Sequence, residues 1–143
     1  MPQHEPLSVL LAVKPGLLRN ALQNLLSTMQ SFDVISMTGD LPASLDAVEN
    51  QCPAVVLVDM VLIQSGLDIA EEIIETTQMN GGHCIILTQN ARQKRLIEER
   101  GTVQAVVWGT RPHKLVEIIE TAMGESNRYR RSHRLDASSD HFA

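Results

Sequence analysis

The sequence predicts a single α/β domain in which helices cover both faces of a five-stranded parallel sheet. Short apolar runs alternate five times with segments of helical spacing, and this order implies parallel strands joined by right-handed crossovers. The run from Ala54 to Val58 contains no polar residue, as expected of a strand buried on both faces. It ends at Asp59, which places a carboxylate at the sheet edge where open α/β sheets bind their ligands.

The first part of the chain is expected to supply two strands and two helices. The strands are residues 7–13 and 32–37, and the helices are residues 17–29 and 44–50. Pro15 and Gly16 end the first strand, and the leucines that follow fall on one helical face. The second helix is expected to be capped by Ser44 or a neighbouring residue and to end before Pro53.

The second part of the chain continues the alternation after a predicted loop at residues 60–65. The strands are residues 54–59, 83–88 and 104–108, and the helices are residues 66–79, 91–100 and 113–123. The helix of residues 66–79 is expected to point Leu67 and Ile74 inward and its glutamates outward. Gly81 and Gly82 stop this helix, and Asn90 is a suitable N-cap for the next.

Composition indicates a globular protein with an aliphatic core. Hydrophobic residues make up 43% of the chain and aromatic residues 3%. No apolar run is long enough to span a membrane, and the polar start of the chain is unlike a signal peptide, so a cytoplasmic location is expected. Cys52 and Cys84 are expected to be free and buried, because disulfides are rare in that compartment.

Charge divides the chain into an acidic body and a basic tail. Residues 1–124 carry 8 basic and 14 acidic side chains, whereas residues 125–143 carry 4 basic and 3 acidic ones. The net charge of −5 argues against nucleic-acid binding by the body. We expect residues 1–124 to form the domain and residues 125–143, which lose the apolar content, to be a disordered tail or linker.

Five segments together resemble the receiver domain of two-component response regulators, a CheY-like fold within the flavodoxin-like group. They are residues 53–59, 65–68, 85–88 and 101–108, together with residues 112–115. The resemblance covers about residues 7–123 and is greatest to NarL- and FixJ-like receivers. It implies a three-layer αβα sandwich, a (βα)5 chain with strand order 2-1-3-4-5. It also implies that Asp59 stands where receivers accept a phosphoryl group from a histidine kinase.

The resemblance also assigns the other positions of a receiver's phosphorylation site. The acidic pair that holds Mg²⁺ after the first strand falls on Val13 and Lys14, and the lysine after the fifth strand falls on Trp108. The hydroxyl position is kept as Thr88, while the aromatic switch position falls on Ala105. The family implies Mg²⁺, but its acidic ligands are missing here, so no metal or other cofactor is expected.

These replacements favour a site that does not carry out phosphoryl transfer. Asp59 would then be a structural acid, and Lys14 is either its counter-ion, standing where Mg²⁺ stands in receivers, or a solvated loop lysine. The alternative is a phosphoacceptor that works through an unusual site. Thr88 is either a functional switch or a strand-end residue bonded to a loop. Trp108 either covers the pocket or anchors a partner.

Three functions follow from these observations. The first is an atypical receiver, a pseudo-receiver, that signals through protein–protein contacts and is not an enzyme. The second is a working receiver that a histidine kinase phosphorylates on Asp59. The third is a flavodoxin-like small-molecule binder, against which the lack of a glycine-rich phosphate loop after the first strand counts.

The expected partner is a signalling protein, such as a histidine kinase. Receivers commonly dimerise through their fourth helix, fifth strand and fifth helix, which fall here on residues 91–100, 104–108 and 113–123. The resemblance therefore implies a homodimer through this face. Neither a membrane nor nucleic acid is an expected partner.

Overall fold

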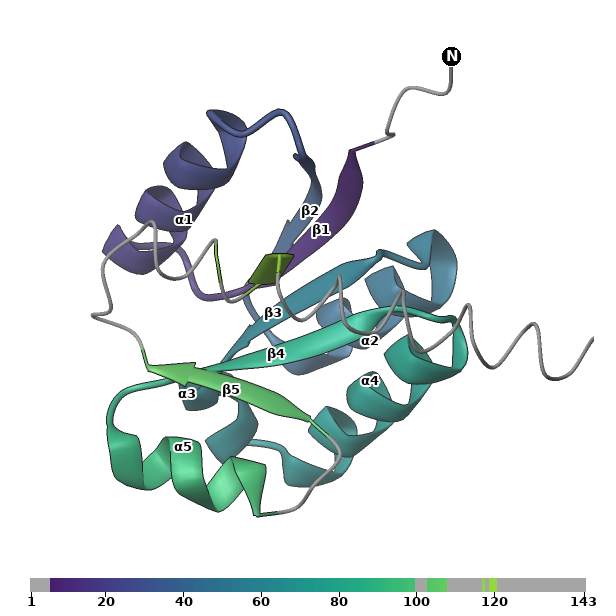
Figure 1. The fold of residues 1–143 in the computed structure, drawn as a ribbon. Helices are drawn as coiled ribbons and strands as arrows, with labels where there is room; N and C mark the ends of the chain where they lie inside the picture. Colours follow the sequence, from purple (N-terminus) through teal and green to yellow (C-terminus); the bar gives the residue numbers. More distant parts are fainter. Residues whose placement is uncertain (1–5, 100–102, 108–116, 118, 121–143) are drawn as a thin grey trace, which may run out of the picture. The chain divides into compact units, whose positions relative to one another are not determined.

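Five parallel strands form one sheet in the order β2-β1-β3-β4-β5 (Figure 1). The computed structural model describes residues 6–99, 103–107, 117, 119 and 120. The strands are β1 Leu7–Ala12, β2 Phe32–Thr38, β3 Val55–Asp59, β4 His83–Thr88 and β5 Gln104–Val107. The helices are α1 Leu17–Ser27, α2 Leu41–Gln51, α3 Met60–Gln64, α4 Leu67–Met79 and α5 Ala91–Glu98. The predicted alternation and strand order are confirmed.

The chain divides into two compact units, Met1–Gly109 and Thr110–Ala143. All of the strands and helices above belong to the first unit. In the second unit Glu117, Ile119 and Glu120 are described and are helical. The predicted domain boundary near residue 124, the predicted basic tail and most of the predicted helix at 113–123 lie outside the described residues and stay predictions.

Helices cover both faces of the sheet within the first unit, which confirms the predicted three layers. Successive strand residues point to opposite faces. On one face, Leu10 of β1, Val56 of β3 and Ile86 of β4 join a core that also contains buried residues of α2, α3, α4 and α5. The other face is covered by α1, which buries Leu22 and Leu26 and lies across the sheet from α2, α4 and α5 (Figure 1).

The predicted loop at residues 60–65 is wrong, because Met60–Gln64 form the short helix α3. No proline or glycine interrupts this segment, and its Leu62 and Ile63 are buried. The helix begins directly after β3, with Asp59 as its N-cap, and ends at Ser65. Burial of two apolar side chains stabilises a helix that would be too short to form alone.

The predicted start of helix α2 is also wrong, because this helix begins at Leu41 and not at Ser44. Its N-cap is Asp40, whose Oδ1 accepts a hydrogen bond from Ala43 N at 2.8 Å. Pro42 lies in the first turn, where its missing N–H would have no helical partner. Ser44 is buried inside the helix and its hydroxyl donates to the Asp40 carbonyl at 2.7 Å.

The two cysteines are free, as predicted, but only Cys84 is buried. Cys52 is exposed, so the prediction that it is buried is wrong. It lies before β3 as the C-cap of α2, in the left-handed region with φ 47°, and its N–H bonds to the Val48 carbonyl. Pro53 follows and cannot continue the helix. Within the described part of the chain, no helix is long and apolar enough to cross a membrane.

Candidate functional site

The carboxyl ends of β1, β3 and β4 bring the predicted site residues to one edge of the sheet. Asp59 ends β3 and lies in register with Leu87 of β4, so Thr88 follows one residue further along. Ala12 of β1 lies in register with Val58, which places Val13 at the level of Asp59. The fold therefore gathers Asp59, Val13 and Thr88 as the sequence predicted.

Asp59 caps a helix, a role that the sequence did not predict. Its Oδ1 accepts a hydrogen bond from Val61 N at 3.1 Å, and its backbone is extended with φ −72° and ψ 130°. This geometry makes Asp59 the N-cap of α3. The negative charge is also favourable beside the N–H groups at the start of a helix. One oxygen of the half-buried carboxylate is thus already engaged.

The predicted ion pair between Lys14 and Asp59 is wrong. The structure describes both residues, places no ion pair between them and leaves the Lys14 side chain exposed. An ammonium group is strongly hydrated, so moving it beside a half-buried carboxylate costs desolvation free energy. A single ion pair can contribute less than this cost. Asp59 receives its hydrogen bond from the Val61 N–H instead.

Arg19 is the cation that lies at the end of β1. Its Nε donates a hydrogen bond to the Val13 carbonyl at 2.8 Å, and its guanidinium lies against Gly39. A sequence signal for this role exists, because Arg19 is the only basic residue of α1 and lies in the first turn. A cation there opposes the helix dipole, so a compensating partner is needed.

Val13 offers no oxygen for a ligand from its side chain. It is 1% exposed, its N–H bonds to the Thr38 carbonyl at 3.0 Å and its carbonyl accepts from Arg19. An apolar side chain therefore fills a position at which receivers carry an acid. Its backbone groups are held by β2 and α1.

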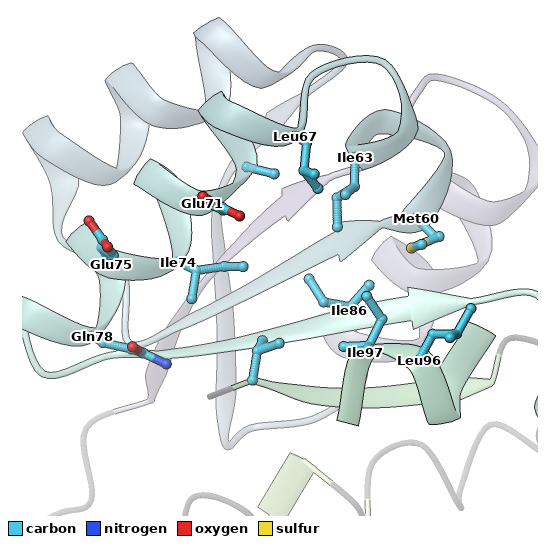
Figure 2. A pocket seen from close by; sticks show the side chains of 12 residues that line it. Met60, Ile63, Leu67, Glu71, Ile74, Glu75, Gln78, Ile86, Leu96 and Ile97 are labelled. Carbon is cyan, nitrogen blue, oxygen red and sulfur yellow. The ribbon is translucent and has the colours of Figure 1, made fainter. Parts of the chain in front are cut away.

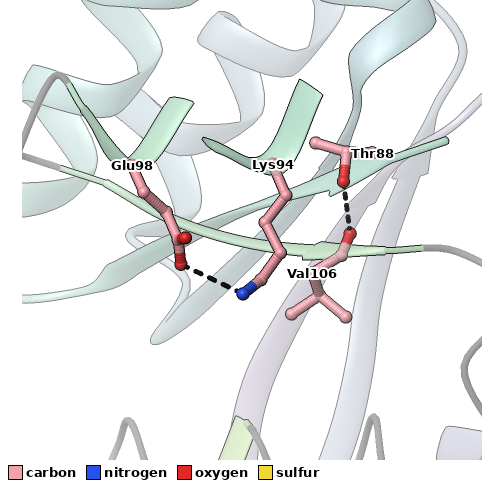
Figure 3. A network of polar contacts seen from close by, with 4 residues as sticks. All are labelled: Thr88, Lys94, Glu98 and Val106. Atoms are coloured by element: carbon pink, nitrogen blue, oxygen red, sulfur yellow. Dashed lines mark hydrogen bonds and ion pairs between the residues drawn. The ribbon is translucent and has the colours of Figure 1, made fainter. Parts of the chain in front are cut away.

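The Thr88 hydroxyl is engaged inside the sheet. Thr88 is fully buried, and its Oγ1 donates to the Val106 carbonyl of β5 at 3.0 Å (Figure 3). The partner is a neighbouring strand and not the loop considered above. Ala105, next to Val106, is buried in the core and leaves no aromatic side chain at that position. Trp108 lies outside the described residues, so the choice between pocket cover and partner anchor stays open.

The residues at this edge do not fit Mg²⁺. The ion needs a near-octahedral set of oxygens, and receivers supply part of that set from an acidic pair after the first strand. Asp59 supplies one carboxylate with an oxygen already bonded, while Val13 and Lys14 supply none. Among the described residues, no three or more His, Cys, Asp or Glu side chains gather as a metal site.

A surface ion pair lies on α5, near this edge but apart from it. Lys94 Nζ is 3.4 Å from Glu98 Oε2, and both side chains are substantially exposed (Figure 3). Pairs of this kind one helical turn apart contribute only a few tenths of a kcal/mol, about 0.3–0.5. The pair therefore neutralises charge on α5 more than it stabilises the fold.

The comparisons with known proteins agree on the fold. No protein-family model matches the chain, and no curated protein sequence matches it. A two-component response regulator of the LuxR family from Aurantimonas is similar in structure, with a TM-score of 0.69 and 19% identity over 84% of this chain and 86% of that one. The response regulator domain of Thermotoga maritima CheB is also similar, with a TM-score of 0.70 and 15% identity over 83% of this chain and 97% of that one.

A third neighbour has a different name but the same fold. The pilus assembly protein CpaE from Caulobacter crescentus matches with a TM-score of 0.62 and 16% identity, over 80% of this chain and 92% of that one. The sheet order and these neighbours define the class: the chain has the CheY-like fold of response regulator receiver domains.

Proposed function

We propose that the chain is an atypical receiver domain that signals through protein–protein contacts, without Mg²⁺-dependent phosphorylation and without enzymatic activity. One observation carries the proposal. The groups that survive at the phosphoacceptor edge are committed to the fold, because Asp59 caps α3 and the Thr88 hydroxyl bonds to Val106. The position of a metal ligand is filled by the buried Val13.

Phosphoryl transfer depends on electrostatic stabilisation that this edge does not supply. Removal of a single preorganised charge or hydrogen-bond donor from such a site costs about 10²–10³ in rate. Here both metal-ligand positions and the lysine position are replaced, by Val13, Lys14 and Trp108. The loss of several such groups would lower the rate of phosphoryl transfer by more than the loss of one. This supports a signalling role that does not depend on phosphoryl transfer.

A working phosphoacceptor is the second candidate, and one observation favours it. Asp59 is only half-buried, and its Oδ2 accepts no hydrogen bond from the residues that the structure describes. A free and accessible carboxylate oxygen is what a phosphoryl donor requires. In this candidate a histidine kinase would phosphorylate Asp59 through an unusual site.

Exposure of the protein to Mg²⁺ with acetyl phosphate or beryllofluoride separates these two candidates. We expect no mass increase and no change in the amide spectrum around Asp59, with a typical receiver as the positive control. A stoichiometric adduct that disappears in Asp59→Asn would overturn the phosphorylation-independent proposal and establish the second candidate.

Location and partners complete the proposal. The proposed location is the cytoplasm, and the proposed partner is another signalling protein. A homodimer through residues 91–100, 104–108 and 113–123 remains our proposal for self-association. Two neighbours of the same fold are named for pilus assembly, which fits a use of the fold outside response regulation.

A further inference from the structure

A mostly apolar groove of about 720 Å³ lies between α4 and α5, over β4 (Figure 2). Ile86 of β4 and Ile97 of α5 contribute buried side chains to it, and Met60 and Ile63 of α3 close one end. Because Asp59 caps α3, the groove begins directly beside the phosphoacceptor edge. The proposed homodimer face shares the α5 wall of this groove, whereas the α4 wall has no role described above.

One face of α4 forms a long wall of this groove. Leu67, Glu71, Ile74 and Gln78 all line it, and their spacing of four, three and four residues is that of a single helical face. At 1.5 Å per residue, this stripe extends over roughly 16 Å. The groove therefore matches the length of a helix of about three turns.

Apolar side chains on both walls remain accessible. Leu67 on α4 is 48% exposed and Leu96 on α5 is 52% exposed, so the prediction that Leu67 points into the core is wrong. Figure 2 shows these two residues on opposite sides of the groove. Exposed apolar surface gathered around a concavity marks an interaction site more often than scattered exposed residues do.

Charge distinguishes the two walls. α4 carries four acids and no basic residue, and two of the acids, Glu71 and Glu75, line the groove. α5 carries Arg92, Lys94 and Arg95 against Glu98. An occupant that lies along the groove would therefore be best matched by basic residues on its α4 side.

We propose that this groove binds an amphipathic helix of a signalling partner. The apolar face of that helix inserts between Leu67 and Leu96, and basic residues along one flank lie beside the exposed Glu75. Helix-in-groove recognition uses apolar anchors at helical spacing, as the α4 stripe requires. The inference deepens the proposed function and rests on it for the premise that the domain signals by contact.

A designed peptide of about 18 residues, with leucines on one helical face and lysines beside them, tests the proposal. Titration into ¹⁵N-labelled full-length protein should give saturable shifts at Leu67, Ile74 and Leu96. A peptide with glutamate in place of lysine should bind at least about threefold more weakly, because its flank repels the acidic wall.

Matched variants separate groove binding from general attraction to an acidic protein. Leu96→Asp should weaken binding by about tenfold or more, because a carboxylate replaces an apolar contact. Its control is Met79→Asp, since Met79 is 86% exposed and lies outside the groove. Glu75→Lys should weaken binding by roughly threefold, whereas Glu72→Lys, on the same helix but outside the groove, should have little effect.

Several outcomes would overturn the proposal. Equal binding of the two peptides, or shifts confined to another surface, would exclude a basic helix in this groove. A dimer that Leu96→Asp dissociates, with no peptide binding, would show that a second copy of the chain occupies it. If Leu96→Asp fails to fold, Leu67→Ser at the half-exposed opposite wall replaces it. A beryllofluoride adduct at Asp59 would contradict the proposed function alone, because peptide binding is measured without phosphate.

Discussion

Asp59 Oδ1 accepts a hydrogen bond from the backbone N–H of Val61 at 3.1 Å, so the residue predicted at the phosphoacceptor position is the N-cap of α3. Asparagine can accept the same bond, whereas alanine cannot. We expect Asp59→Ala to lower the free energy of unfolding by about 1 kcal/mol. Asp59→Asn should lower it by only a few tenths of a kcal/mol. Urea unfolding measures both, and equal losses would argue against a capping role.

The hydrogen bond from Thr88 to the Val106 carbonyl joins β4 to β5 in the buried part of the sheet. Thr88→Val keeps the side-chain shape but removes the donor, so we expect a loss of about 1 kcal/mol. Thr28 is the matched control, because its hydroxyl also bonds to a carbonyl, that of Leu25, but is exposed to water. Thr28→Val should cost less in the same urea measurement, and an equal cost would count against a structural role for the Thr88 hydroxyl.

Arg19 and Lys14 both follow β1, but only Arg19 is bonded to the end of the strand. Arg19→Ala removes a charged donor from the Val13 carbonyl and should cost about 1 kcal/mol of stability. Lys14→Ala removes an exposed side chain and should change stability by less than about 0.5 kcal/mol. Thermal and urea unfolding of the two variants check this. A larger effect of Lys14→Ala would restore the predicted ion pair as an explanation.

Burial raises the pKa of the Cys84 thiol from 9.0 to about 12. The folded state therefore keeps this proton after the unfolded state has lost it, and stability falls as pH rises from about 9 towards 12. The slope should reach about 1.4 kcal/mol per pH unit from this group. Urea unfolding across the window should show a flatter pH dependence in Cys84→Ala, although that variant is less stable overall. Parallel curves for the two proteins would contradict the assignment.

The structure links Asp59 to the groove through a single short helix. α3 begins at the Asp59 cap, and its Met60 and Ile63 line one end of the groove. A change in the bonding of the Asp59 carboxylate would therefore act first on residues that a docked helix contacts. This arrangement connects Asp59 to the proposed docking groove without any requirement for phosphate.

The architecture could be predicted from residue order, because hydrophobic periodicity is local information. The apolar runs and helical spacings predicted all five strands, and the acid after the third strand was placed at the correct edge of the sheet. The resemblance to receivers, which assigns their metal-ligand positions to Val13 and Lys14, also depends on the sequence alone. These features depend on residue type and order, which folding does not alter.

Which polar groups meet depends on how the elements pack, and residue order did not predict it. Lys14 and Asp59 lie at the ends of adjacent strands. The lysine is nevertheless exposed to solvent, and the carboxylate accepts a hydrogen bond from the backbone of α3. The segment at 60–65 is too short for periodicity to reveal a helix, and its burial and cap decide its conformation. Leu67 looked like a core residue from spacing alone, but the separation of α4 from α5 leaves it on a groove wall. Side-chain direction and the distance between helices are set by packing, and a one-dimensional pattern does not contain them.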